Sequence, residues 1–419
     1  MARGKLVHGR SIAGAPPRIL LRMSLQYATN GIWQDAALVD RAQQVGAQYA
    51  ATVLETAQDI ARVSSPTGHE ANRADFVSML FQRHGVPEVS KDDIHDVVAR
   101  VPASTNSQSA VLLAAHIDTV FAHGTTLNIF SDGERAFGPG LGDNSLGVAA
   151  VVHLKEMLDA IGAAVESDLL LTGNVGEEGL GNLRGVTRVL DDHPEIGAMV
   201  AVEGQNLGRI THIAVGSQRL RITVTGPGGH SWGDFGNPNA IHHAASLIDA
   251  LARIPLTQSP KTTLSVGTIT GGISINSIAP DVTFDLDLRS TDPVSLRRLI
   301  DRVYAALTPR DDRISVTIDV IGSRPAGQVA ASSRVVTSAA EILRLLGYPA
   351  SADASSTDAN AAIARGIPAI CVGMTTGANA HRLEEYVDIE PIATGLSQLA
   401  LLTLSLAHDL KHGLLKSGQ

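Results

Sequence analysis

Two patterns of expected strands and helices follow one another along this chain, and their order restricts the folds it can adopt. Helical spacing of apolar residues predicts helices at 36–63, 70–84 and 146–160, and short apolar runs predict strands at 96–101, 110–115, 168–172 and 198–202. Short runs bounded by glycine or acidic residues are typical of buried parallel strands. We therefore expect an α/β fold, an α/β/α domain with a mixed, mainly parallel sheet.

A different order of elements interrupts this pattern. The expected elements are a strand at 219–225, a helix at 239–253, strands at 263–270 and 281–289, a helix at 293–308 and a strand at 314–321. This β-α-β-β-α-β order is the split βαβ unit, an α+β sandwich of about 100 residues. After it the first pattern resumes, with a helix at 333–346, a strand at 368–373 and a helix at 391–410.

The interruption predicts a small domain inserted into a larger one. We expect residues 36–216 and 326–419 to form the larger domain, and residues 217–325 to form the inserted one. Residues 1–35 lack clear periodicity and are expected to form an N-terminal arm.

Composition excludes several classes of protein. Of the 419 residues, 44% are hydrophobic, which is enough for a large core and excludes disorder of the whole chain. The 42 acidic residues outnumber the 33 basic ones and no basic cluster is present, so we expect no nucleic-acid partner. The single cysteine, Cys371, excludes an internal disulfide and a cysteine-based zinc cage.

The chain carries no sequence signal for a membrane. No stretch approaches about 18 unbroken apolar residues, so we expect neither a transmembrane span nor a membrane partner. Arg18 and Arg22 interrupt the apolar region that a secretory signal would need. We therefore expect a cytoplasmic location.

Residues able to bind a metal follow the predicted strands. They are His116, Asp118, Asp143 on the loop Gly138–Asn144, Glu177, Glu178 and Glu203. His116 and Asp118 share a face, because side chains alternate along an extended chain. The carboxyl ends of strands are where α/β sheets place their sites. Each residue also has a structural explanation, such as Asp143 capping the next helix.

Considered together, one histidine and several carboxylates favour a metal site. Oxygen-rich ligation with a few imidazoles suits zinc, manganese or cobalt, and a shared carboxylate permits a site with two metals. One carboxylate of the adjacent pair Glu177-Glu178 can bind a metal while the other faces a water.

A competing motif is Gly229-His230-Ser231-Trp232-Gly233, which fits the G-x-S-x-G elbow of serine hydrolases. The elbow needs a helix directly after the serine, whereas Asp234–Pro238 intervenes before helix-like sequence resumes. We therefore disfavour a serine nucleophile. His230 on this glycine-rich turn can instead donate to a developing oxyanion.

The chain resembles the co-catalytic zinc peptidases and deacylases over about residues 36–412. This family includes glutamate carboxypeptidase, acetylornithine deacetylase, succinyl-diaminopimelate desuccinylase and bacterial tripeptidases. The motifs that carry the resemblance are Ala114–Phe121, Gly138–Asn144, Gly176–Gly179 and His381 before Glu385–Asp388. They look like the first ligand strand, the bridging-aspartate loop, the Glu-Glu motif and the last ligand.

The resemblance implies two divalent metal ions bridged by Asp143, with zinc expected first and manganese or cobalt as alternatives. His116 and Glu203 would hold one ion, and Glu178 and His381 the other. Glu177 would be the general base on a metal-bridging water. It also implies that Asp118 orients His116 and that the peptide bond after Asp143 is cis.

The inserted unit looks like the family's lid and dimerisation domain, which implies a homodimer or a higher homo-oligomer. His230 would polarise the scissile carbonyl, often in the partner subunit's site. Asn276 matches a substrate-contacting position, and Arg289 and Arg324 look like residues that hold a substrate carboxylate. For either arginine a plain salt bridge is the alternative.

The predicted function is a dinuclear-metal hydrolase that cleaves an amide or peptide C–N bond in a small carboxylate-bearing substrate. One alternative is an aminohydrolase that releases ammonia from a non-peptide, possibly aromatic, amino acid, and another is a non-catalytic ligand-binding relative. Two departures from the family pattern concern the substrate. Asn144-Ser145 replaces a common Asp-Lys, and Trp232 is bulkier than the residues often found beside the histidine.

Overall fold

A computed structural model of the chain describes residues 30–104, 106–309 and 311–415. Most of the expected N-terminal arm lies outside the described residues. Its last part forms a one-turn 3-10 helix at Ile32–Gln34, in which Trp33 is buried. This turn packs against α1 (Ala36–Ala61) and α9 (Ile392–Lys411).

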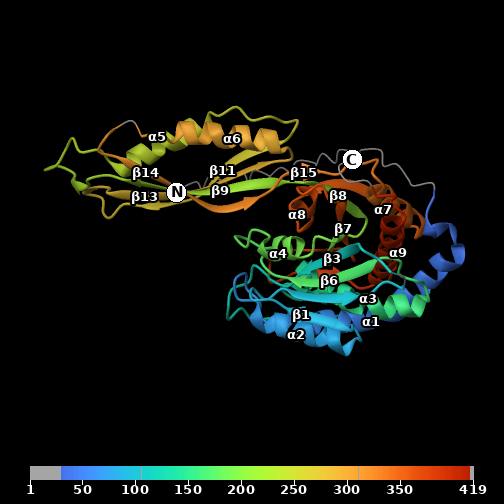
Figure 1. Ribbon diagram of the computed structural model, residues 1–419. Helices are drawn as coiled ribbons and strands as arrows, with labels where there is room; N and C mark the ends of the chain where they lie inside the picture. The colour runs from blue at the N-terminus through green and yellow to red at the C-terminus, as the bar shows by residue number, and fades with distance from the viewer. Residues whose placement is uncertain (1–29, 105, 310, 416–419) are drawn as a thin grey trace, which may run out of the picture.

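A mixed nine-stranded sheet forms the centre of the larger unit (Figure 1). Its order is β1 (Glu88–Lys91), β2 (Val97–Val101), β6 (Asp168–Asn174), β3 (Ala110–His116), β7 (Ile196–Glu203), β17 (Ala369–Gly373), β8 (Arg209–Ala214) and β15 (Gly327–Gln328), with β16 (Ser351–Ser355) also paired to β8. The central strands β6, β3, β7 and β17 are parallel, whereas β1, β2 and β15 pair antiparallel at the edges. The expected fold class is confirmed.

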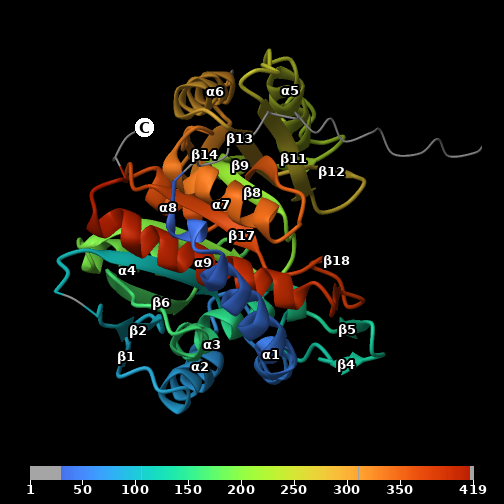
Figure 2. The same ribbon diagram turned by 90° about the vertical axis from the view of Figure 1, so that its right-hand side faces the viewer.

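Helices cover both faces of this sheet (Figure 2). One face carries α1, α9, α2 (Ala71–Arg83), α3 (Leu146–Ile161) and α7 (Arg334–Leu345). The other carries α4 (Arg184–Asp192) and α8 (Ala359–Ile363). Because helices shield both faces, every residue of β3 is buried.

The smaller unit lies beside the larger one and has its own sheet (Figure 1). The strand order is β11 (Thr262–Gly271), β13 (Asp281–Ser290), β9 (Gly216–Thr225) and β14 (Ser315–Arg324), all antiparallel, with α5 (Ala240–Ala252) and α6 (Pro293–Ala306) on one face. Burial alternates along β13, as expected of a sheet with one covered face. The two units have separate hydrophobic cores. The domain boundaries stay a prediction.

Two short sheets complete the described structure. One contains β4 (Phe130–Ser131), β5 (Arg135–Phe137), β19 (Tyr386–Asp388) and β18 (Gly377–Ala378), and the other pairs β10 (Gly229–His230) with β12 (Ser277–Ile278). The first sheet supports the loop that carries His381. None of the described helices is long and apolar enough to cross a membrane.

Candidate active site

The candidate ligands meet at the carboxyl edge of the central strands. His116 is the last residue of β3, Glu203 is the last residue of β7, and Glu177 and Glu178 follow the end of β6. Because β6, β3 and β7 are parallel neighbours, their carboxyl ends bring these side chains together. Asp143 is supplied by the turn Leu141–Ser145 before α3.

Asp143 connects two clusters of potential metal ligands. Its Oδ1 lies 3.1 Å from His116 Nε2, and its Oδ2 lies 3.1 Å from His381 Nε2. Glu203 Oε2 lies 3.7 Å from His116 Nε2, and Glu178 Oε1 lies 3.0 Å from His381 Nε2. Each cluster thus combines one imidazole with two carboxylates, and Asp143 belongs to both.

These residues fit a pair of divalent cations. Glu178 Oε1 is buried, and apart from its 3.0 Å contact with His381 Nε2 it has no hydrogen-bond partner within the described part of the chain. The side chains of Asp143 and then Glu178 raise the pKa of His381 to about 10. Burial raises the pKa of Glu203 to about 7. The carboxylates in each cluster favour positive charge beside them. A divalent cation bound there would supply that charge and offset the repulsion between the carboxylates.

The aspartate turn is held by Glu385, a residue that sequence reasoning used only as a landmark. Glu385 is buried, and its carboxylate accepts backbone hydrogen bonds from Gly140 (2.9 Å), Gly142 (2.7 Å) and Asp143 (2.8 Å). Burial, and then the charge of Asp143, raise its pKa to about 8 despite these hydrogen bonds. No sequence pattern signals such a contact across 242 positions.

Asn144 ties the aspartate turn to the end of β7. Its Nδ2 donates to the Val202 carbonyl at 2.7 Å, and its Oδ1 accepts from Gly204 N at 2.9 Å. An aspartate could not make both bonds when ionised, because it has no donor. A Cβ on Gly204 would lie 2.3 Å from the Gly142 carbonyl oxygen, so glycine is required there. The Asp143–Asn144 peptide is cis, as expected.

Glu177 and Arg324 form a buried pair beside the two clusters. Arg324 Nη1 donates to Glu177 Oε1 at 2.9 Å, and Arg324 Nη2 donates to the Glu177 carbonyl. Burial raises the pKa of Glu177 well above its ordinary value, although Arg324 opposes this. Arg324, predicted to hold a substrate carboxylate, thus contacts the predicted base in this structure.

Asp118 lies beneath His116 and holds the Glu-Glu turn. Its carboxylate accepts hydrogen bonds from the backbone nitrogens of Glu177 (3.0 Å) and Glu178 (2.9 Å), and from the Thr67 hydroxyl (2.8 Å). His116 Nδ1 lies 3.1 Å from the Asp118 carbonyl oxygen and 3.6 Å from its Oδ1. The backbone carbonyl is therefore nearer to the ring than the carboxylate is.

A cavity of about 410 Å³ is lined by both clusters and by arginines from both units. The guanidinium-bearing residues that line it are Arg209, Arg219, Arg289 and Arg324. The Asp287 carboxylate accepts hydrogen bonds from Arg219 Nε (3.2 Å) and Arg289 Nε (2.7 Å), so one carboxylate faces two cations. These four arginines, here called the arginine wall, suit an anionic group of a substrate. Arg209 and Arg219 had no sequence signal.

His230 and Asn276 lie away from this cavity. Both are exposed, and neither lines it. Ser231 N donates to the Asn276 carbonyl at 2.9 Å, which joins the turn after β10 to the loop before β12. The next helix begins only at Ala240, so Ser231 has no elbow geometry.

Comparison with known proteins identifies the family to which the chain is similar. Residues 112–405 match the family model described as peptidase family M20/M25/M40. Succinyl-diaminopimelate desuccinylase from Corynebacterium glutamicum is 27% identical over 350 residues, covering 80% of this chain and 91% of the relative.

Two solved structures share the fold. Aminopeptidase PepT from Bacillus cereus superposes with a TM-score of 0.72 at 20% identity, covering 85% of this chain and 99% of that one. The YXEP protein of Bacillus subtilis, described as a dinuclear metal-binding peptidase, gives a TM-score of 0.62 at 15% identity, covering 86% and 99%.

Proposed function

The chain belongs to peptidase family M20/M25/M40 and is a metal-dependent hydrolase of C–N bonds, and we propose that it cleaves the amide bond of a small carboxylate-bearing substrate with two zinc ions. The observation that carries this proposal is the position of Asp143. One carboxylate lies between two histidines, each of which has a further carboxylate beside it.

The ligand assignment follows from these distances. His116 and Glu203 would hold one ion, Glu178 and His381 the other, and Asp143 both. Sites with one imidazole and two carboxylates suit zinc, with manganese or cobalt as alternatives. When bound, the ions would supply Lewis acidity to the scissile carbonyl and a nucleophile at neutral pH.

Glu177 is the proposed general base. Its carboxylate would take the proton of the attacking water and pass it to the leaving nitrogen. Burial, which raises the pKa of Glu177, suits a group that must accept a proton and then give it up. Arg324 would position this carboxylate through its bond to Oε1.

The arginine wall supports an anionic substrate. Arg289 lies on β13 with its side chain 40% exposed, and Arg324 Nε is buried without a hydrogen-bond partner in the described part of the chain. Both line the cavity and are the proposed contacts of a substrate carboxylate.

Homodimerisation through the smaller unit would complete the site. His230 and Asn276 are exposed, and large apolar side chains surround them: Trp232, Phe235, Ile273 and Ile275 are 77–104% exposed. Exposed apolar clusters are typical of protein interfaces. We propose that this face meets a second copy and that His230 enters the partner's site. A cytoplasmic location stays our prediction.

We expect a chelator to abolish activity, because the proposed ions would supply the Lewis acidity and the nucleophile of the reaction. Dialysis into zinc, manganese or cobalt should restore turnover, and the metal content measured with it should be at least two ions per chain. Full activity of the metal-stripped protein would contradict the proposal.

A substrate screen separates amide hydrolysis from ammonia release. Zinc-loaded protein should be supplied with dipeptides, N-acyl amino acids and aromatic amino acids, and both the freed amine and ammonia should be measured. We expect a new amine from a peptide or acyl substrate. Ammonia from a non-peptide amine as the sole product would instead establish the aminohydrolase alternative.

Replacing Arg289 by Gln should raise KM with little change in kcat. A hydrogen bond to a charged group contributes about 1.5–3 kcal/mol, so kcat/KM should fall roughly 10- to 100-fold. The control is a substrate whose carboxylate is replaced by a carboxamide, which should lose little affinity. An equal loss for both substrates would exclude Arg289 as the carboxylate contact.

A further inference from the structure

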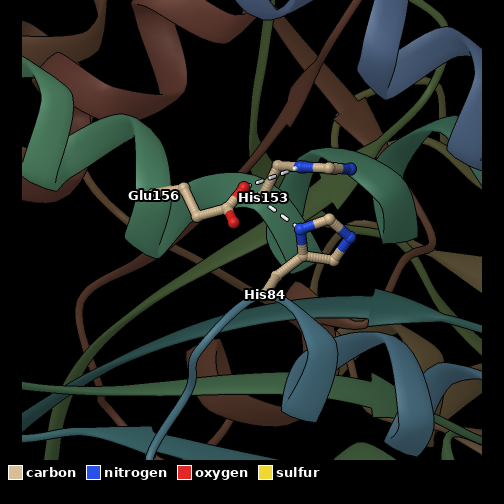
Figure 3. A group of neighbouring side chains, drawn as sticks. All are labelled: His84, His153 and Glu156. Atoms are coloured by element: carbon tan, nitrogen blue, oxygen red, sulfur yellow. Dashed lines mark hydrogen bonds and ion pairs between the residues drawn. The ribbon is translucent and has the colours of Figure 1, made fainter.

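A second group of possible metal ligands lies outside the active site, where α2 meets α3. His84 caps the C-terminal end of α2, and His153 and Glu156 lie one turn apart on α3. Both histidine rings direct Nδ1 at the Glu156 carboxylate (Figure 3). None of these three residues lines the catalytic cavity.

The distances in this group match those between ligands of one metal ion. Glu156 Oε2 lies 3.1 Å from His84 Nδ1 and 3.3 Å from His153 Nδ1, and all three ligand atoms lie within 4.8 Å of one another. Two ligands held about 2.0–2.1 Å from a tetrahedral zinc ion are about 3.3 Å apart. The side chains therefore need little movement to take up an ion.

His153 is the buried member of this group. Its side chain has no exposed surface, and its two ring nitrogens have one partner each, Glu156 and Thr56. A metal ion would bind the neutral form of this imidazole.

Thr56 on α1 can fix the orientation of the His153 ring. Its hydroxyl lies 2.9 Å from His153 Nε2. With Nδ1 bound to a metal, Nε2 carries the proton and donates to this oxygen, an arrangement typical of metal-binding histidines. The side chains of His84 and Glu156 are 16% and 35% exposed, so an ion can enter from solvent and keep a water as its fourth ligand.

We propose that His84, His153 and Glu156 form an additional zinc site that cross-links α2 to α3. Two imidazoles and one carboxylate are a ligand set that zinc favours. Since α3 begins directly after the Leu141–Ser145 turn, the ion would brace the helix that follows Asp143. This site would be structural and separate from the catalytic pair.

A similar group on the surface, Glu166 with His408 and His412, is a weaker candidate for a metal site. All three side chains are 31–52% exposed, and both histidines lower the pKa of Glu166, as expected of ordinary ion pairs. His153 differs because it is buried and has a partner that can fix its free nitrogen. The experiment must therefore show which of the two groups holds an ion.

The experiment compares the zinc content of the intact protein with that of His84→Asn after equilibration at the same free zinc concentration. The expected loss is one ion per chain. Glu156→Gln should give the same loss, because an amide keeps the shape of the carboxylate but binds zinc poorly. His242→Asn, an exposed histidine on α5, is the matched control and should leave the content unchanged.

Diffraction at the zinc absorption edge locates the ion. We expect an anomalous peak about 2.0–2.1 Å from Nδ1 of His84 and of His153. Chelated His84→Asn should unfold within about 2 °C of the chelated wild type, which excludes a folding defect. Absence of the peak, or equal zinc content in wild type, His84→Asn and Glu156→Gln, would overturn the proposal and leave a hydrogen-bonded His–Glu network.

Discussion

Replacing Glu177 by Gln is expected to lower kcat by about 10²- to 10⁴-fold while the protein keeps the metal content of the wild type. Glutamine cannot accept the proton of the attacking water, but its amide oxygen can still accept the hydrogen bond from Arg324 Nη1. Glu177 belongs to neither ligand cluster, so metal binding should persist. The measurements are steady-state kinetics and metal analysis of the same sample.

The adjacent residue supplies the matched control. Glu178 Oε1 lies 3.0 Å from His381 Nε2, so Glu178→Gln should lose one ion as well as activity. The two neighbouring substitutions would thus separate proton transfer from metal binding. Glu177→Ala is less informative, because loss of one partner of a buried ion pair costs about 3–5 kcal/mol of stability. Near-normal turnover of metal-loaded Glu177→Gln would place the base elsewhere.

The sequence predicts the main elements well because each has a local signal. Helix α3 was expected at 146–160 and spans Leu146–Ile161, and β3 was expected at 110–115 and spans Ala110–His116. Long periodic segments carry enough residues for the pattern to be unambiguous. The sequence analysis missed helix α4 and the strands β1, β8 and β16, which are four to six residues long. It also missed β15 and β18, which are two residues long and depend on pairing with distant strands.

The proposed metal ligands could be predicted for a related reason. His116 and Glu203 terminate buried apolar strands, where a polar residue is conspicuous. His381 has no such signal, because it lies on the loop between β18 and β19 and does not terminate a buried strand. Its φ is +67°, a conformation that non-glycine residues seldom adopt. Only the resemblance to a family indicated it.

The residues that hold the ligands in place could not be predicted from local sequence. Glu385 reaches the Asp143 turn across the fold, and Asn144 joins that turn to β7 through two hydrogen bonds. Arg324 was expected at a substrate carboxylate, yet it also contacts Glu177. Such contacts depend on tertiary packing, which periodicity and motif spacing do not describe.

A heterodimer that combines Glu177→Gln in one subunit with His230→Ala in the other should regain about half of wild-type activity, although neither homodimer is active. Loss of an oxyanion donor costs about 10²- to 10³-fold in kcat. In the heterodimer, one site keeps its own Glu177 and receives the partner's intact histidine, while the other site lacks both groups. Co-expression with two different affinity tags isolates this species.

A second heterodimer is expected to be inactive, and it tests directly whether His230 acts in the partner's site. Pairing wild type with a subunit that carries both substitutions leaves each site without one group if His230 crosses to the partner, so this protein should be inactive. If His230 serves its own subunit, the same protein keeps one intact site, and the first heterodimer has none. The two proteins contain the same substitutions in different arrangement, so differences in stability cannot imitate the result. The exposed position of His230, outside the cavity that holds Glu177, favours the crossed arrangement.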